Sequence, residues 1–265
     1  MTLQHASAVN QQSPGTDISD GRRQPIRFAS LDRDLRVDVC IVGAGIAGLS
    51  TAYELLQAGL KVAVIELGEL CAGDTRMTTA HLSNAIDDRF TELERILAPQ
   101  TIRLVAESHT MAIDRIEQIV SRHGIDCDFL RVDGYLFLAE DHSVSLLDDE
   151  LQAARRAGLK VEKLDRAPLK PWDTGPCLRF PRQAQFHPLK YLSALAQEIV
   201  RQGGQIFTNS QASKIQGGTP ASLEANGHTV TADAPVVATN TPINDLIAIH
   251  TKQAPYMRYA IGARI

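Results

Sequence analysis

The chain has 265 residues, a formal net charge of -4 and 44% hydrophobic residues, a composition typical of a globular protein with one large domain or two small ones. It holds no Lys/Arg cluster longer than a pair, which argues against nucleic-acid binding, and no apolar run approaches the ~18 residues of a membrane span. Its 4 scattered cysteines form no CxxC and no Cys/His pair at metal-ligand spacing, so we expect reduced thiols, no metal site and a cytoplasmic location.

Residues 1–34 are predicted to form a disordered tail. They are polar, rich in Gln, Ser and Asp, and show neither helical nor strand periodicity. Arg22 and Arg23 are not followed by the apolar segment that a twin-arginine export signal requires, so we reject an export signal.

A dinucleotide-binding unit is predicted from Val37 onward. The stretch VDVCIVGAGIAGLSTAYELLQAGLKVAVIEL predicts an apolar strand, a helix of small residues and a second strand that ends at Glu66. Gly43, Gly45 and Gly48 follow the first strand and open the helix, the context that the GxGxxG fingerprint requires. The first glycine allows a tight turn, the second lets the backbone approach a pyrophosphate, and the third lets the helix pack closely on the strand.

The chemistry of a dinucleotide indicates which residues of this unit would bind it. The helix N-terminus offers N–H donors and a partial positive charge to a diphosphate. Glu66 is expected to accept hydrogen bonds from both ribose hydroxyls and to repel a 2′-phosphate. These contacts suit NAD or FAD, and the candidate binding residues are Gly43, Ala44, Gly45, Ile46, Ala47, Gly48 and Glu66.

The segment after the second strand favours FAD over NAD. A typical NAD dehydrogenase continues into an ordinary helix, whereas this chain continues into the polar loop CAGDTRMTTAHLSN, residues 71–84. Small, apolar and acidic residues also fall where two-domain flavoproteins have them, at Ala52, Leu55, Gly59, Val62, Val64, Glu66 and Gly73.

On these residues, and from about Val37 to its end, the chain resembles the D-amino-acid-oxidase-like family of FAD-dependent oxidoreductases, which includes enzymes that oxidise glycine, sarcosine and dimethylglycine. The resemblance implies an α/β fold, with a Rossmann-like FAD-binding domain of the two-domain flavoprotein type and part of a mixed-sheet substrate domain. It also implies oxidation of a C–N bond of an amine or amino acid by hydride transfer to flavin N5.

The resemblance further implies that the polar loop passes along the flavin, with Thr75, Arg76, Thr78, Thr79 and Ala80 lining FAD. Some family members attach FAD covalently through a His in this loop. That position falls near Met77 here, so we expect non-covalent FAD.

Three residues are candidates for the catalytic site. His81 follows the loop and would be useful beside the flavin or in the substrate cavity, because histidine exchanges protons near neutral pH. The alternative for His81 is a hydrogen-bonded packing residue. Arg258 or Tyr259 could hold a substrate carboxylate, and the alternative is a pair at the surface or between domains.

The resemblance divides the rest of the chain between two domains. Residues 35–90 would form the first part of the FAD-binding domain and residues 91–185 the first part of the substrate domain. Residues 186–250 would complete the FAD-binding domain, and residues 251–265 would begin the return to the substrate domain.

Local signals predict the elements of residues 91–185. Thr91 and Glu94 suggest a capping box, and a long apolar stripe predicts a helix that Gly124 ends. A hairpin or strand pair is expected with Gly134 between its halves, followed by a helix that stops at Gly158.

The distal part of the chain predicts a helix from Pro188, a strand over 205–208 and a hairpin through Asn226 and Gly227. By resemblance, Ala212 would present its backbone to the adenine edge, and Thr239 would lie beside the nucleotide. Asn240 replaces a usual glycine and is expected to tolerate a positive φ.

Two alternatives to the flavoenzyme remain open: an NAD(P)-linked dehydrogenase, and a non-catalytic or incomplete nucleotide-binding fragment. The chain ends inside an apparent strand, so we expect a truncated member of the family. The loop and the stretch APYMRY also resemble a subgroup with a C-terminal Rieske-type iron–sulfur domain. The small-molecule substrate, the electron acceptor and the oligomeric state are not determined by the sequence.

Overall fold

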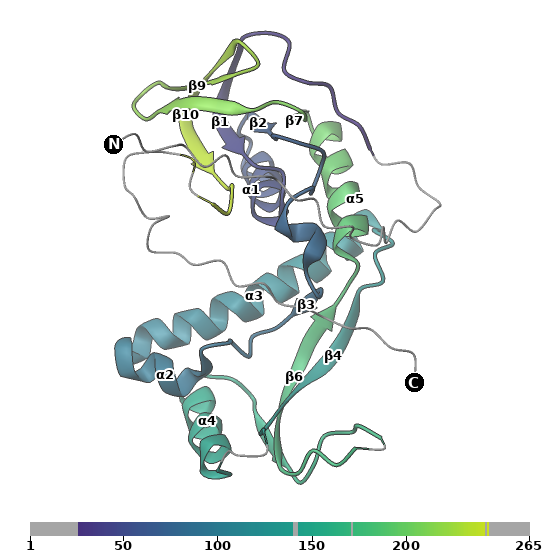
Figure 1. Cartoon of the computed structure of the whole chain (residues 1–265), viewed down its shortest axis with the longest axis vertical. Coiled ribbons are helices and arrows are strands. Elements are labelled where there is room, and N and C mark those ends of the chain that lie inside the picture. Colours follow the sequence, from purple (N-terminus) through teal and green to yellow (C-terminus); the bar gives the residue numbers. More distant parts are fainter. Residues whose placement is uncertain (1–25, 140–142, 171, 242, 244–265) are drawn as a thin grey trace, which may run out of the picture.

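The computed structural model describes residues 26–139, 143–170, 172–241 and 243. Two bodies are joined by one long helix (Figure 1). The first body contains a six-stranded sheet, and the second contains a four-stranded sheet with three helices. No helix in these described ranges has the length and apolarity that crossing a membrane requires.

The first body is built on a mixed sheet. Its strands, in spatial order, are β7 (Gln205–Phe207), β2 (Val62–Ile65), β1 (Leu35–Val42), β10 (His228–Val237), β9 (Ala221–Ala225) and β8 (Ala212–Gln216). The first four run parallel, and β8, β9 and β10 pair antiparallel. Helices α1 (Ile46–Gln57) and α5 (Pro188–Arg201) pack against this sheet (Figure 1).

Burial explains why β1 and β2 lie at the centre of this sheet. All four side chains of β2 are buried, which is the pattern of a parallel strand covered on both faces. Val39 and Ile41 pack with α1 and α5 on one face, whereas Val42 packs with β9 and β10 on the other. The parallel strands therefore end at one common edge, where ligands bind in open α/β sheets.

The second body holds an antiparallel sheet and a helical layer. Its strands are β3 (His81–Leu82), β6 (Cys177–Gln185), β4 (Leu130–Phe137) and β5 (Glu162–Leu164), and the first three lie in that order. The helices are α2 (Arg89–Ile96), α3 (Pro99–His123) and α4 (Ser145–Arg156). They bury a shared core against Leu178 and Phe180 of β6.

Helix α3 connects the two bodies. Its first half packs in the core of the second body, and Ile119 near its end packs with α1 and α5 in the core of the first. At the same end, His123 Nε2 lies 2.8 Å from the Tyr53 hydroxyl and His123 Nδ1 lies 3.5 Å from the Glu198 carboxylate. Core packing and polar contacts therefore both fix α3 to the first body.

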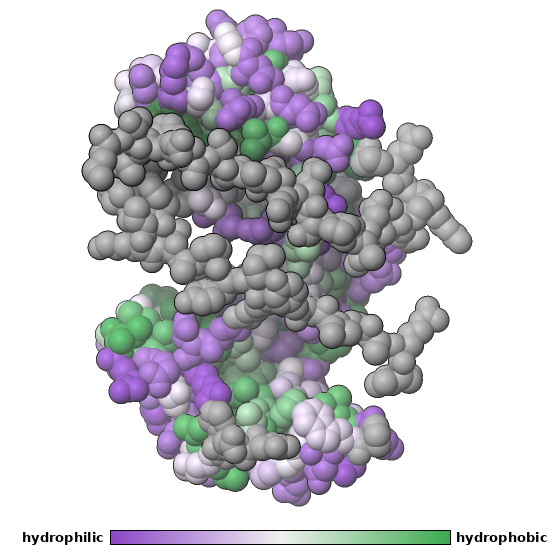
Figure 2. Space-filling model, in the orientation of Figure 1, coloured by the Kyte–Doolittle hydropathy of each residue, from purple (hydrophilic) through white to green (hydrophobic). Residues whose placement is uncertain are grey.

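On one face of the molecule, the surface differs between the two bodies. The face in Figure 2 is largely hydrophilic over the first body and carries more apolar side chains over the second. Ile96 of α2 and Leu104 and Met111 of α3 are among the exposed large apolar residues.

The helix ends and the distal hairpin confirm the local predictions. Gly124 ends α3 with a φ of 59°, Gly158 follows α4, and Pro188 begins α5. Asn226 and Gly227 join β9 to β10 with positive φ at both positions, as a two-residue hairpin turn requires.

The predicted tail is wrong in its last part. The Thr208 hydroxyl donates to Phe28 O at 2.7 Å, and Leu31 N–H donates to Ser210 Oγ at 2.9 Å. Leu31 is 3% exposed, so burial of this side chain orders a segment whose composition indicated disorder. Residues 1–25 lie outside the described part of the chain.

The predicted capping box is also wrong. Helix α2 begins at Arg89, so Thr91 lies inside it, and Glu94 instead pairs with Arg156 at 2.7 Å. Glu150 of α4 accepts from Phe90 N–H at 2.9 Å and from Thr91 N–H at 3.0 Å. A buried carboxylate from another helix thus satisfies the first turn of α2.

The predicted hairpin around Gly134 is a single strand. Gly134 lies inside β4, which pairs with β6 and shifts its register between Val132 and Gly134. A Cβ at Gly134 would lie 3.1 Å from Gln183 Cγ, so close packing against β6, and not a turn, accounts for this glycine.

Glu198 gives the stability of the first body a defined pH dependence. Hydrogen bonds from Arg201 lower the pKa of the Glu198 carboxyl to about 2, and Gln202 and His123 act in the same direction against the effect of burial. Because the unfolded chain takes up this proton first, at a pKa of about 4.3, the stabilisation is complete only above about pH 5. It is lost as the pH falls from about 5 toward 2.

We therefore expect Glu198→Gln to lower the free energy of unfolding by about 2 kcal/mol at neutral pH. Urea unfolding at a series of pH values measures this free energy, and its difference between the variant and the parent chain should vanish toward acid pH. Glu92→Gln is the control, since the Glu92–Arg95 pair is exposed and should contribute little. An equal loss for Glu198→Gln at acid and neutral pH would contradict the assigned pKa.

Candidate cofactor site

The glycine-rich turn between β1 and α1 admits no side chain at two positions. Gly43 has a φ of +108°, and a Cβ there would lie 2.5 Å from Ala238 O at the end of β10. A Cβ at Gly48 would lie 1.9 Å from Gly43 O. The close approach of α1 to β1 that the spacing predicts is therefore present, and only glycine permits it.

The N-terminus of α1 is shaped for an anion. Its N-cap residue, Gly45, provides no side-chain cap, and the first turn contains no acidic residue. The first N–H groups of a helix have no acceptor within the helix, and the helix dipole makes this end positive. A Cβ at Gly45 would lie 3.0 Å from Thr75 Oγ1, so this glycine lets the Thr75 hydroxyl approach the start of the helix.

Glu66 lies at the end of β2, beside this turn. Its Oε2 accepts from Ala44 N–H at 2.6 Å and its Oε1 accepts from Gly68 N–H at 3.0 Å. The side chain is half-buried, and a carboxylate retains further lone pairs for hydroxyl donors. The carboxylate is thus fixed in place where the fingerprint puts a ribose-binding acid.

Cys71 opens the loop but carries no reactive thiolate. It is 3% exposed, and its Sγ lies 3.4 Å from Ala44 O. Burial and the charge of Glu66 raise the pKa of the Cys71 thiol to about 12. This cysteine is therefore a packing residue beside the turn.

The polar loop lies against the helix N-terminus. Ile46 N–H donates to Thr75 Oγ1 at 3.3 Å, and Asp74 accepts from the Asn240 side chain. The loop therefore joins the first turn of α1 to the chain just after β10. Thr239 N also lies at this turn, 3.5 Å from where a Gly43 Cβ would be.

The remaining loop residues differ in exposure and backbone conformation. Ala80 has a φ of 65°, and its N–H donates to Thr78 Oγ1 at 3.2 Å. Arg76, Thr78 and Thr79 are exposed, so their side chains are accessible to a ligand.

His81 occupies the second sheet, outside the glycine-rich turn. It begins β3 and pairs with Gln185 of β6, and its side chain is exposed. Leu82, the next residue, packs toward the core of the first body. Since successive strand residues point to opposite faces, His81 points away from that core.

Ala212 is the first residue of β8 and pairs with Ala225. Two residues earlier, Ser210 N–H donates to Glu66 O at 2.8 Å, which brings this part of the chain beside Glu66. Asn240 has the expected positive φ, at 62°. Arg258 and Tyr259 lie outside the described residues.

The fold and this edge of the sheet define a dinucleotide-binding protein of the α/β class. Comparison with known proteins identifies the family. Residues 38–261 match the DAO family, described as FAD dependent oxidoreductase, and the chain belongs to that family. FAD is the cofactor of this family, which decides between the FAD and NAD(P) alternatives in favour of FAD.

Individual relatives cover most of this chain. The protein YhfW of Bacillus subtilis (strain 168), whose name describes it as a Rieske 2Fe-2S iron-sulfur protein, is 34% identical over 82% of this chain and 43% of its own length. Gamma-glutamylputrescine oxidoreductase of Escherichia coli (strain K12) is 28% identical over 83% of this chain and 53% of its own length. The chain thus spans about half the length of these curated relatives.

Solved structures support the fold. Glycine oxidase from Geobacillus kaustophilus has a TM-score of 0.62 and 21% identity, over 77% of this chain and 55% of that one. L-proline dehydrogenase from P. horikoshii has a TM-score of 0.63 and 15% identity, over 78% of this chain and 53% of that one. The chain therefore has the mixed α/β fold of two-domain flavoproteins.

Gly48→Ala tests the closest contact of the site. The added methyl group would overlap Gly43 O, so the turn must shift, and we expect a loss of about 1–3 kcal/mol in stability together with weaker FAD binding. Thermal unfolding and FAD titration measure the two effects. Gly217→Ala is the control because a Cβ there meets nothing within 4 Å. Parent-like values for Gly48→Ala would show that the turn has room for a side chain.

Proposed function

We propose that the chain carries the FAD-binding half of an oxidoreductase that oxidises a C–N bond of an amine or amino acid. One observation carries the proposal. The polar loop contacts the N-terminus of the dinucleotide-binding helix through Thr75 and Ile46, at 3.3 Å. A loop of small hydroxyl residues at this end of the helix suits a cofactor whose flavin extends beyond its diphosphate.

The residues present fit FAD. The first turn of α1, whose N-cap residue Gly45 has no side chain, suits the pyrophosphate, and Glu66 suits the adenosine ribose. Backbone groups of Ala212 would meet the adenine. The residues proposed to hold the cofactor are Gly43, Ala44, Gly45, Ile46, Ala47, Gly48, Glu66, Thr75, Arg76, Thr78, Thr79, Ala80, Ala212 and Thr239.

When bound, FAD supplies the redox chemistry by accepting, at N5, a hydride from a substrate C–H next to nitrogen. The chain contributes binding and orientation. The loop would offer backbone N–H groups and hydroxyls to the flavin, and Arg76 would add a positive charge beside it. His81, exposed at the start of β3, is proposed to meet the substrate and to hold or release a proton.

We assign residues 35–90 and 186–250 to the FAD-binding domain and residues 91–185 to the substrate domain. The separate apolar cores of the two bodies support this division, but two segments cross it. Ile119 of α3 packs in the first core, whereas β3 pairs with β6 of the second body and Phe90 packs in the second core. We also propose a cytoplasmic location, which the buried free thiols Cys40, Cys71, Cys127 and Cys177 support. Recovery of the chain from a secreted fraction would contradict it.

The electron acceptor has one specific candidate. Similarity to YhfW supports a Rieske-type 2Fe-2S cluster. The described residues contain no group of three or more His, Cys, Asp or Glu side chains that could hold a metal ion. We therefore propose that the cluster is not held by the described residues. Reduced protein should pass electrons to a separately purified Rieske protein faster than to O2, and the reverse order would contradict this acceptor.

Reconstitution with FAD tests the proposed function. We expect the chain to retain the visible absorbance of oxidised flavin and to release intact FAD on acid precipitation. Met77, at the position of a covalent anchor in the family, is 75% exposed and should leave the cofactor dissociable. Absorbance that stays with the precipitate would contradict non-covalent binding, and absence of flavin would contradict the function.

Bleaching of the bound flavin distinguishes an enzyme from a nucleotide-binding fragment. In the absence of O2, a panel of amines and amino acids should include at least one compound that bleaches it. If the chain retains flavin but no compound of the panel bleaches it, the result would favour a non-catalytic nucleotide-binding fragment.

Arg258→Met tests the proposed carboxylate contact. If the Arg258 guanidinium binds a substrate carboxylate, KM for amino acids should rise by at least about tenfold. KM for amines without a carboxylate should stay close to that of the parent chain. Steady-state kinetics on such a pair of substrates measures the difference, and an equal change for both would assign Arg258 to packing.

A further inference from the structure

The cofactor loop, defined here as residues 73–80, continues into an unusually short strand. β3 has two residues and pairs with β6 only through His81 with Gln185 and Leu82 with Ala184. Ala80, the residue just before it, has a φ of 65°, a region that non-glycine residues adopt at a cost. Two paired positions provide few hydrogen bonds to fix the backbone at Ala80. The contacts of the residues that follow β3 are therefore needed to hold this part of the chain in place.

Side chains continue the pairing where the backbone ladder stops. Gln183 Oε1 accepts from Asn84 N–H at 2.7 Å, and Gln183 Nε2 donates to Asn84 Oδ1 at 2.8 Å. Gln183 Nε2 also donates to Pro181 O at 2.9 Å. Asn84 and Gln183 are 8% and 3% exposed, so these bonds are shielded from water. The side-chain amide of Gln183 therefore extends the hydrogen bonding between β3 and β6 by one further position.

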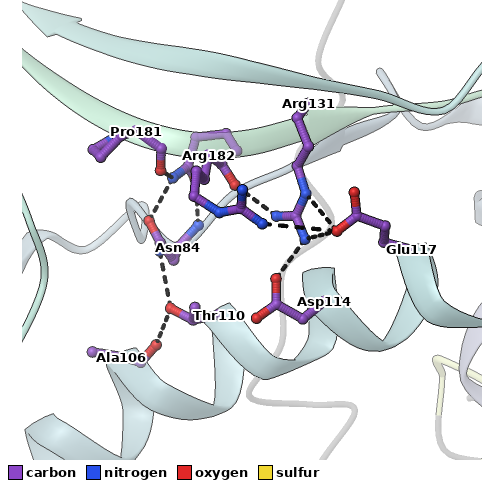
Figure 3. A network of polar contacts seen from close by, with 9 residues as sticks. Asn84, Ala106, Thr110, Asp114, Glu117, Arg131, Pro181 and Arg182 are labelled. Atoms are coloured by element: carbon purple, nitrogen blue, oxygen red, sulfur yellow. Dashed lines mark hydrogen bonds and ion pairs between the residues drawn. The ribbon is translucent and has the colours of Figure 1, made fainter.

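The same pair is tied to helix α3. Asn84 Nδ2 donates to Thr110 Oγ1 at 3.0 Å, and Thr110 Oγ1 donates to Ala106 O at 2.8 Å. Figure 3 shows this chain of bonds running from Asn84 down onto the helix. Because α3 is packed into the nucleotide-binding core at its far end, Asn84 connects β3 to the body that holds the dinucleotide.

Helix α3 holds the neighbouring strands through the next turns of the same face. Arg131 of β4 donates to Glu117 at 2.6 Å and to Arg182 O of β6 at 2.7 Å (Figure 3). Strands β4 and β6 and the segment after β3 are therefore all bonded, directly or through one another, to one helix. The segment after β3 reaches the helix through Asn84 and, in an exposed contact, through Ser83 O, which lies 3.4 Å from His109 Nδ1. The buried bonds of this segment are those of Asn84 and Gln183.

We propose that Asn84 and Gln183 are positioning residues for the cofactor. They act through β3 by fixing the end of the cofactor loop that its contact with α1 leaves free. The loop is thereby held at Thr75 by α1, and the segment that follows it is held at Asn84 by α3, so residues 73–80 and His81 keep one conformation. This inference rests on the proposed function for the identity of the cofactor.

Gln183→Met tests the inference. Methionine keeps the length of the side chain and removes both amide bonds to Asn84. We expect amide hydrogen exchange across residues 73–85 to accelerate about tenfold in the chain without cofactor, and FAD to bind about tenfold more weakly. The absorbance spectrum of the remaining bound flavin should also shift.

Glu150→Met is the matched control. Glu150 is 2% exposed and bonds to backbone N–H groups of α2, so the same kind of buried polar contact is lost. It should accelerate exchange over residues 89–96 and leave FAD affinity and the flavin spectrum unchanged. Thr110→Val removes the contact from Asn84 Nδ2 together with the bond from Thr110 Oγ1 to Ala106 O, and leaves both bonds between Gln183 and Asn84 in place. It should give a smaller version of the Gln183→Met result and replaces that variant as the test if Gln183→Met does not fold.

The outcomes separate this inference from the proposed function. Unchanged exchange across residues 73–85 in Gln183→Met and Thr110→Val would overturn the positioning role, as would an equal loss of FAD affinity in Glu150→Met. A parent chain that binds no FAD would overturn the proposed function instead, and the exchange data would still decide whether the pair fixes the loop.

Discussion

The structure depends on one close contact, between the first turn of α1 and the end of β1. A Cβ at Gly48 would lie 1.9 Å from Gly43 O, so this approach exists only because Gly48 lacks a side chain. The contact determines the direction of α1 and places its N-terminus at the edge where the parallel strands end. The position of every other part of the candidate site follows from that edge.

Three separate segments reach this turn by different means. Glu66 arrives on β2 and accepts from Ala44 N–H, the end of β10 presents Ala238 O beside Gly43, and Thr75 accepts from Ile46 N–H. The first two are brought there by parallel pairing with β1. The third comes from a loop with no strand of its own at this edge, so side-chain contacts alone hold it there.

Sequence predicted the features whose cause is local. The glycine-rich turn, the end of α3 at Gly124 and the Asn226–Gly227 turn each depend on the φ that a few neighbouring residues adopt. Features with a distant cause were missed. The first turn of α2 is satisfied by Glu150, about 60 residues away, and Gly134 is required by β6. Asn84 and Gln183 are 99 residues apart, and no local pattern indicates that they pair.

The conformation of the loop therefore has to be supplied by its surroundings. Cys71 and Ala80 both adopt left-handed backbone, at φ of 57° and 65°, and each such non-glycine residue costs about 1 kcal/mol or more. The loop between them is largely exposed and buries too little to offset this cost. Burial of Cys71 beside the turn offsets it at one end, and the bonds of Asn84 and Gln183 offset it at the other. A loop strained at both ends and anchored at both ends keeps one shape before the cofactor arrives, which lowers the entropy lost on binding.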